Sequence, residues 1–141
     1  MSSGRHFPLR WPDCADRWTG KRLPSRFPGH TFAAARTALV DEIKRLGGQR
    51  VVISSNVRPR PDGMPYAGEK PTGGDQSPGI AVYWIRGGVE ESMACEVWDD
   101  PTANIVAILK TVEAWRGLAR WGVQIAIINP RNIGWVQRIG P

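Results

Sequence analysis

The chain has 141 residues, 41% of them hydrophobic and 23% charged, which is enough for one domain with its own apolar core. No apolar run is long enough to cross a bilayer, and the start of the sequence lacks the apolar segment of a secretory signal. Cys14, Cys95 and the two histidines show no metal-ligand spacing. We therefore expect a cytoplasmic protein with reduced thiols, no bound metal and no membrane contact, and leave open whether the two cysteines pair.

The net charge of +6 is distributed unevenly along the chain. Residues 1–60 carry a net charge of +8, residues 61–100 carry −6 and residues 101–141 carry +4, and arginine far outnumbers lysine. A guanidinium group offers a planar fork of donors that suits phosphate and stacks on bases. With seven tryptophans, this composition favours a nucleic-acid partner, while a solvated basic surface explains the charge equally well.

Residues 1–30 are predicted to form a basic, irregular N-terminal arm, because repeated prolines interrupt any helix there. Trp11 and Trp18 are the expected apolar anchors that hold this arm against the rest of the chain. The basic side chains of the arm either lie along a phosphate backbone or face solvent while the arm wraps the domain.

An α+β domain is predicted over residues 31–141, and its first element is a helix over 31–46. Thr31 is a suitable N-cap, apolar residues recur at helical spacing, and Gly47 and Gly48 end the helix. The apolar run VVI then predicts a strand over residues 50–56. Because this run has no polar alternation, we expect the strand to be buried on both faces and central in its sheet.

Residues 57–79 are predicted to form a long loop, since ten of these 23 residues are proline or glycine. A connection of this length inside one domain is usually either functional or disordered. Arg58, Arg60 and Lys70 are its candidate contacts with a partner. The alternative is a surface loop that has no partner.

Two apolar strands, over residues 80–85 and 89–98, are predicted to form a hairpin with its turn at residues 86–88. Glu96 stands out in the second strand as a carboxylate among apolar neighbours. It is either a residue at the rim of the domain that reaches solvent or a functional acid with a raised pKa.

A second helix is predicted from Pro101, with Asp100 as its cap, to about Trp121. Arg116 and Arg120 lie one turn apart on its outer surface, where they can grip a pair of phosphates. A strand over residues 123–128 follows, and then a short strand or tail over residues 133–139. The sequence thus predicts a single α+β domain of order αβββαβ, with a mixed sheet of about four strands and its helices largely on one face.

Several stretches resemble an uncharacterised family of proteins from phages and other mobile elements. The resemblance covers about residues 8–122 and is carried by PLRWP, RVVISSNVRPRPDGMPYA, SPGIAVYWIRGG and ACEVWDDPTANIVAILKTVEAWRGLARWG. Some relatives carry a J domain, a co-chaperone module, after this region, and we expect none in this sequence. The resemblance implies a mobile-element setting and this fold, without an established activity.

The element order also resembles the core of the PD-(D/E)XK nucleases. That family holds Mg²⁺ with an acid near the second strand and an acid-x-lysine motif on the third. Asp75 and Glu96 stand nearest to these acidic positions, and Glu42 would supplement them. Trp98 stands where the lysine is expected, so Lys110 would have to replace it. The resemblance implies a Mg²⁺-dependent nuclease or resolvase, active or degenerate.

Three functions are consistent with these patterns. The leading hypothesis is an accessory protein of a phage or mobile element that binds DNA or RNA without catalysis, through Arg58, Arg60, Lys70, Arg116 and Arg120. The second is the nuclease, with Glu42, Asp75, Glu96 and Lys110 as its catalytic set. The third is a protein-interaction module that binds a host or phage nucleoprotein complex. No phosphate-binding loop or hydrolase motif supports another enzyme class.

Overall fold

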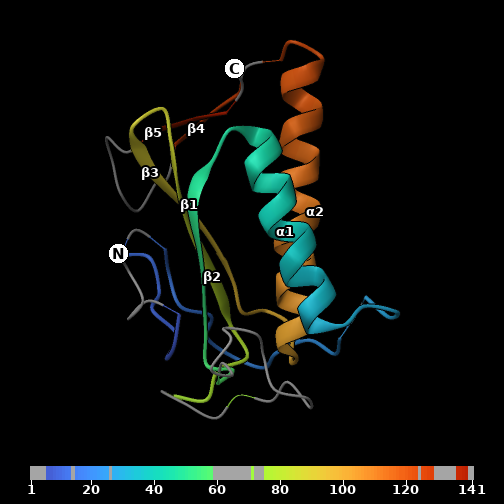
Figure 1. Ribbon diagram of the computed structural model, residues 1–141. Helices are drawn as coiled ribbons and strands as arrows, with labels where there is room; N and C mark the ends of the chain where they lie inside the picture. Colours follow the sequence, from blue (N-terminus) through green and yellow to red (C-terminus); the bar gives the residue numbers. More distant parts are fainter. Residues whose placement is uncertain are drawn as a thin grey trace.

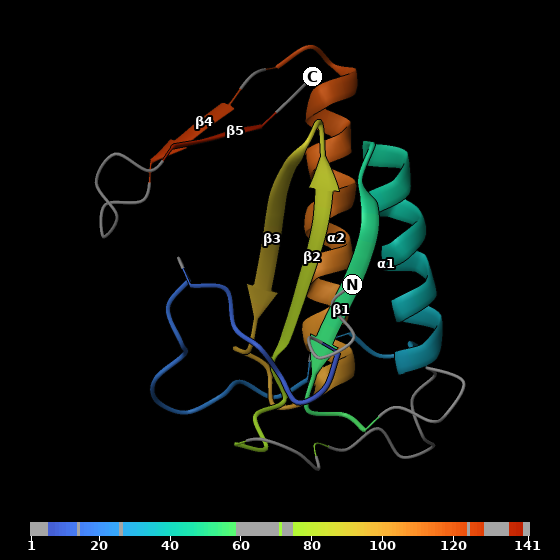
Figure 2. The ribbon, with the colours of Figure 1, turned by 60° about the vertical axis from the view of Figure 1, so that its left-hand side comes forward.

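The computed structural model describes residues 6–13, 15–25, 27–58, 71 and 75–123, and the backbone alone of residues 125–128 and 136–139. Two helices and five strands lie in these residues, and both helices cover one face of a three-stranded sheet (Figure 1 and Figure 2). In chain order the elements are α1 (Phe32–Leu46), β1 (Gln49–Ser55), β2 (Ile80–Arg86), β3 (Val89–Cys95), α2 (Pro101–Arg120), β4 (Ile125–Ile128) and β5 (Val136–Ile139).

The α+β class is confirmed, but the predicted mixed sheet of about four strands is wrong. The main sheet has three strands in the order β1-β2-β3, and all of its pairings are antiparallel. β4 does not join it and pairs with β5 in a separate hairpin, so the order is αβββα followed by that hairpin. A strand of four residues forms its backbone hydrogen bonds most readily with a segment close to it in sequence, because closing a short loop costs little chain entropy.

β1 is an edge strand, and its predicted central position is also wrong. Its apolar run is explained by cover on both faces of the sheet. Ile53 packs into the core beneath the helices, whereas Val52 packs on the opposite face with Leu9 of the N-terminal arm. The central strand is β2, whose first five residues are all buried.

Local sequence signals set the bounds of both helices as predicted. The Thr31 hydroxyl accepts a hydrogen bond from the Ala34 amide at 3.1 Å, and Gly47 ends α1 in the left-handed conformation with φ 106°. Asp100 caps α2 by accepting from the Ala103 amide at 3.2 Å, and Pro101 occupies the first helical position.

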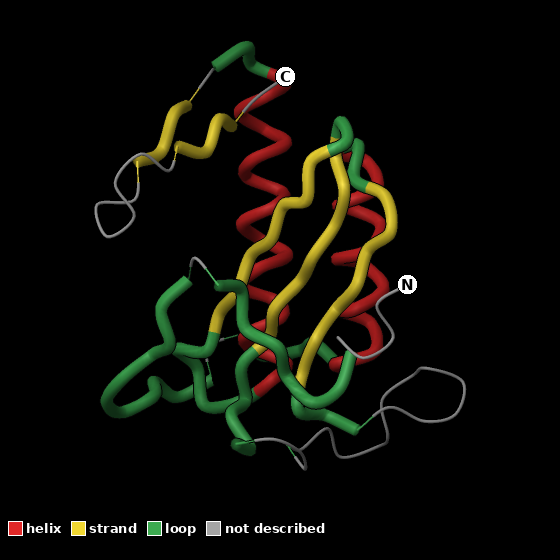
Figure 3. The backbone as a smooth tube through the Cα atoms, turned by 90° about the vertical axis from the view of Figure 1, so that its left-hand side faces the viewer, coloured by secondary structure: helices red, strands yellow, loops and turns green. Residues whose placement is uncertain are grey.

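The apolar core lies between the sheet and the two helices. Trp84 of β2 packs against Trp115 of α2, with 6.2 Å between their ring centroids, and Leu39 and Ile43 of α1 are fully buried. Burying each such side chain contributes about 1.5–3 kcal/mol. The opposite face of the sheet is covered by the N-terminal arm, which crosses the strands in Figure 3.

The two ends of the domain differ in what they display. We call one end of the domain the arm end, because the N-terminal arm lies there; β1 and β3 finish at this end, and β2 and both helices start there (Figure 2). We call the opposite end the helix end, because both helices finish there; it also contains the start of β1 and the turn between β2 and β3 (Figure 1). Among the described candidates, Arg58, Asp75 and Glu96 lie at the arm end, whereas Arg116 and Arg120 lie at the helix end.

Candidate functional site

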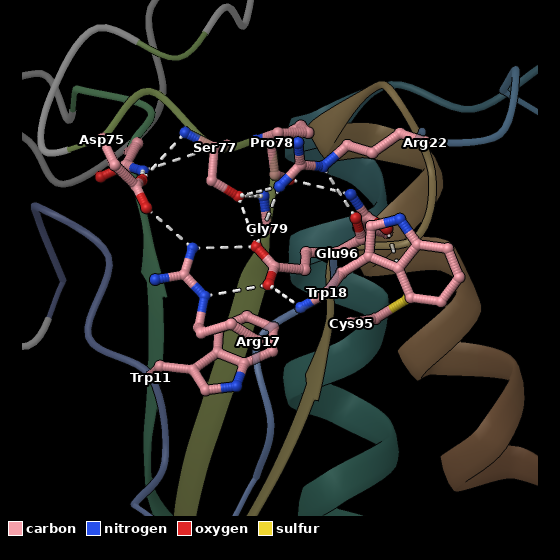
Figure 4. Close-up of polar contacts among 12 residues, drawn as sticks. Trp11, Arg17, Trp18, Arg22, Asp75, Ser77, Pro78, Gly79, Cys95 and Glu96 are labelled. Carbon is pink, nitrogen blue, oxygen red and sulfur yellow. Dashed lines mark hydrogen bonds and ion pairs between the residues drawn. The ribbon is translucent and has the colours of Figure 1, made fainter. Parts of the chain in front are cut away.

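Glu96 lies at the arm end, immediately after β3, and only 2% of its surface is exposed. Its Oε1 accepts hydrogen bonds from Arg17 Nε at 2.9 Å and from the Trp18 amide. Its Oε2 accepts from Arg17 Nη2 at 2.9 Å, from Arg22 Nη2 at 3.1 Å and from the Ser77 hydroxyl at 2.7 Å (Figure 4). Two arginines of the arm therefore neutralise a carboxylate buried against the sheet.

This environment fixes the protonation state of Glu96. Burial raises the pKa of Glu96, but the hydrogen bonds from Arg17, Ser77 and the Trp18 amide outweigh burial and lower the pKa from 4.5 to about 2. Both interpretations drawn from the sequence are wrong, because the side chain neither reaches solvent nor has a raised pKa. A carboxylate that stays ionised near neutral pH is a poor proton donor, which argues against a role as a general acid.

Asp75 joins the same network from the segment before β2. Its Oδ2 accepts from Arg17 Nη2 at 2.8 Å, and its Oδ1 accepts from the Ser77 amide and from Asn56 Nδ2, both at 3.0 Å. The hydrogen bond from the Ser77 amide is the main cause that lowers the pKa of Asp75. Arg17 thus bridges the two carboxylates that the nuclease hypothesis assigned to Mg²⁺.

The other two members of the proposed catalytic set lie elsewhere. Glu42 is buried on α1, where it accepts hydrogen bonds from Arg45 Nη1 and Arg116 Nη1, each at 2.8 Å. Lys110 Nζ lies 5.8 Å from the centroid of the Phe27 ring. Within the described residues, no group of three histidine, cysteine or acidic side chains is arranged to hold a metal ion. Each of the three carboxylates is bound to an arginine, and the four residues of the proposed catalytic set do not share one site.

The residues proposed to bind nucleic acid are also separated. Arg58 is exposed and follows β1 at the arm end, whereas Arg116 and Arg120 lie in the last turns of α2 at the helix end. The 20 residues of α2 span about 30 Å at 1.5 Å per residue. Arg58 and the Arg116–Arg120 pair therefore lie at opposite ends of the domain and do not form one surface. Arg116 is already paired with Glu42. Arg60 and Lys70 lie outside the described residues.

The helix end carries three exposed cations, of which the sequence analysis singled out Arg120 but not Lys44 or Arg50. Lys44 lies in the last turn of α1, Arg50 is the second residue of β1, and Arg120 is the last residue of α2. All three are exposed, and none forms an ion pair within the described part of the chain. Trp121 follows Arg120 and is 74% exposed. We call Lys44, Arg50, Arg120 and Trp121 the basic end.

Arg50 has a backbone conformation that arginine seldom adopts. Its φ is +56°, and the register of β1 against β2 shifts between Gln49 and Val52, which marks a bulge. Glycine is the residue favoured at such a position, and another residue there costs about 1–2 kcal/mol. The bulge becomes visible only in the pairing of β1 with β2, and no local sequence signal marks Arg50.

A second polar network fastens the start of α2. Asn104 is fully buried, and its Nδ2 donates to the Pro78 carbonyl at 2.9 Å and the Trp98 carbonyl at 3.0 Å. Its Oδ1 accepts from the Trp98 amide at 3.1 Å and from Cys95 Sγ at 3.2 Å. Burial raises the pKa of the Cys95 thiol, which is free. Cys14 lies outside the described residues, so its predicted state stays a prediction.

Comparisons of the chain with protein-family models, curated proteins and solved structures found no match. The resemblances to a mobile-element family and to the nuclease core therefore stay predictions. Across the residues that the structure describes, no helix combines the length and apolar character needed to cross a membrane.

Proposed function

We propose that the protein binds nucleic acid without catalysis, and that the basic end is its contact surface. The observation that carries this proposal is that Lys44, Arg50 and Arg120 at the helix end are exposed and have no carboxylate partner in the described part of the chain, with exposed Trp121 next to Arg120. Arginine and lysine without an acidic partner are available for phosphate oxygens, and such contacts supply most of the affinity in sequence-independent binding.

Ion pairs inside the protein already occupy five of the described arginines. Arg17 and Arg22 are bound to Glu96, Arg86 is bound to Glu91, and Arg45 and Arg116 are bound to Glu42; their ion pairs measure 2.8–3.1 Å. A phosphate would have to compete with a carboxylate that is already in place. The unpaired cations are therefore the ones that a polyanion contacts first.

Arg50 is the strongest single support for this surface. A cation in the last turn of a helix offsets the negative end of the helix dipole, which gives Lys44 and Arg120 a structural role as well. Arg50 lies in a strand, makes no ion pair among the described residues and occupies a backbone conformation that favours glycine. Its presence there is accounted for by contact with a partner.

The setting that we propose for this activity is a phage or another mobile element. It rests on the sequence patterns alone, and we propose an accessory role in which the protein coats or holds nucleic acid.

The test measures the affinity of the protein for labelled 20-nucleotide strands of DNA and RNA and for duplex DNA, by fluorescence anisotropy at several salt concentrations. One triple variant replaces Lys44, Arg50 and Arg120 by glutamine. The matched control replaces three exposed cations outside the basic end by glutamine and so changes the net charge equally; its positions are Arg10, Lys21 and Lys110.

We expect the basic-end variant to lose at least about tenfold in affinity, with a salt dependence shallower by about three ion equivalents. The control should change affinity by less than about threefold. Equal losses in the two variants would show that net charge alone attracts the polyanion and would refute the basic end as the site. Failure of the wild type to bind any nucleic acid at low salt would refute the proposal and favour a protein-interaction module.

A further inference from the structure

Trp121 is held in a defined position although it is the most exposed large apolar residue among those described. Its amide donates to the Gly117 carbonyl at 3.1 Å, the Gly122 amide donates to the Ala119 carbonyl at 3.2 Å, and the Val123 amide donates to the Leu118 carbonyl at 3.1 Å. Gly122 has a φ of +79°, which completes this hydrogen-bonded helix end. The ring therefore projects from ordered backbone.

The indole ring rests on the helix at Gly117. A methyl group at Gly117 would lie 3.4 Å from Trp121 Cη2, and the Arg120 guanidinium carbon lies 6.0 Å from the indole centroid. The remaining surface of the ring is open to solvent. A fixed aromatic ring beside an unpaired cation is an arrangement that combines a stacking platform with a phosphate contact.

We propose that Trp121 stacks on an unpaired base of single-stranded nucleic acid while Arg120 contacts an adjoining phosphate. This inference rests on the proposed function and names its ligand class. A duplex keeps its bases stacked on one another, so it offers the ring a base face only at its ends, whereas a single strand offers one at every nucleotide. Lys44, in the last turn of α1, and Arg50, near the start of β1, add positive charge at the same end of the domain, which favours a polyanion.

The surroundings of Trp121 favour a base over a protein partner. The contact residues with the largest effect in protein interfaces lie at the centre of a patch from which water is excluded. The other exposed large apolar residues that the structure describes at the helix end are Val123, at 43%, and Val89, at 61%, which follows the β2–β3 turn. One ring with Arg120 beside it and two valines give little apolar area for a protein partner, whereas they suit a nucleotide, which is small and charged.

The experiment compares a strand of 12 thymidines with an abasic strand of the same length, which has the phosphates and sugars but no bases. Affinities of the wild type, Trp121→Ala, Arg120→Gln and the control Trp18→Ala are measured at one salt concentration. Trp18 is also an exposed tryptophan, at 40%, but it lies on the N-terminal arm. Thermal unfolding of each variant establishes that it is folded.

The wild type should bind the thymidine strand about tenfold more tightly than the abasic strand. Trp121→Ala should remove that difference by weakening only the thymidine complex, Arg120→Gln should weaken both complexes, and Trp18→Ala should change neither. Equal binding of the two strands by the wild type would overturn the stacking role and leave phosphate binding intact. A Trp121→Ala variant that weakens both complexes equally would also overturn it. Binding of neither strand would overturn this inference, and would overturn the proposed function with it if the wild type also binds neither RNA nor duplex DNA.

Discussion

Replacing Glu96 by glutamine should destabilise the protein near neutral pH and have little effect in strong acid. Glutamine has nearly the same shape as glutamate, but it carries no charge for Arg17 and Arg22 and presents an amide to groups that are themselves donors. The variant therefore removes the ion pairs that fasten the arm while leaving the packing in place.

The size of the effect follows from the protonation equilibrium of Glu96. Its pKa falls from 4.5 in the unfolded chain to about 2 in the folded protein, which corresponds to roughly 3 kcal/mol of stability. Because the folded pKa is the lower one, this stability is present above about pH 4.5 and is lost as the pH falls through about 2. We expect the difference between wild type and variant to be about 3 kcal/mol at pH 7 and to approach zero near pH 2.

The measurement is urea unfolding of both proteins at half-unit steps between pH 2 and pH 7, followed by circular dichroism. Glu113→Gln serves as the control, since Glu113 is exposed on α2, and its effect should stay within about 0.5 kcal/mol at every pH. A cost of Glu96→Gln that is the same at all pH values would refute the reasoning, because shape and hydrogen bonding would then account for it without the charge.

Three further substitutions test the packing by the same unfolding assay at pH 7. Gly117→Ala should stabilise the protein by about 0.5–1 kcal/mol, because alanine favours the helix and its methyl meets no atom closer than 3.4 Å. Gly48→Ala should cost about 1–3 kcal/mol, since its methyl would lie 2.5 Å from Ile43 Cγ2; the same sign for both glycines would contradict the described geometry. Asn104→Leu should cost about 3 kcal/mol by leaving buried backbone groups unpaired, and a cost under about 1 kcal/mol would show that water replaces the side chain.

The elements that sequence reasoning placed correctly are those whose signals are local. Thr31 and Gly47 bracket α1, Asp100 and Pro101 begin α2, and the glycines at 87 and 88 form the turn between β2 and β3. Each of these features depends on backbone preferences within a few residues. The partners of a strand depend on contacts far along the chain, which is why β1 was expected at the centre of the sheet and β4 within it.

The same limit applies to Glu96. The sequence shows a carboxylate among apolar residues, which indicates burial or a special role, but it does not name the partner. Arg17 and Arg22 precede Glu96 by 79 and 74 residues. They lie in an irregular arm rich in proline, which has no periodic pattern from which its alignment with the sheet could be predicted. Two arginines among the many in the first 60 residues cannot be assigned to one acid without the fold.

The uneven charge of the sequence has a physical explanation in these pairings. The net +8 of residues 1–60 and the net −6 of residues 61–100 complement each other within the protein, because Arg17 and Arg22 bind Glu96 and Asp75 across that boundary. A basic segment is therefore a poor guide to a binding surface when an acidic segment follows it in the same domain. The cations that matter to a partner are those left unpaired after folding, and Lys44, Arg50 and Arg120 at the helix end are among the described cations that meet that condition.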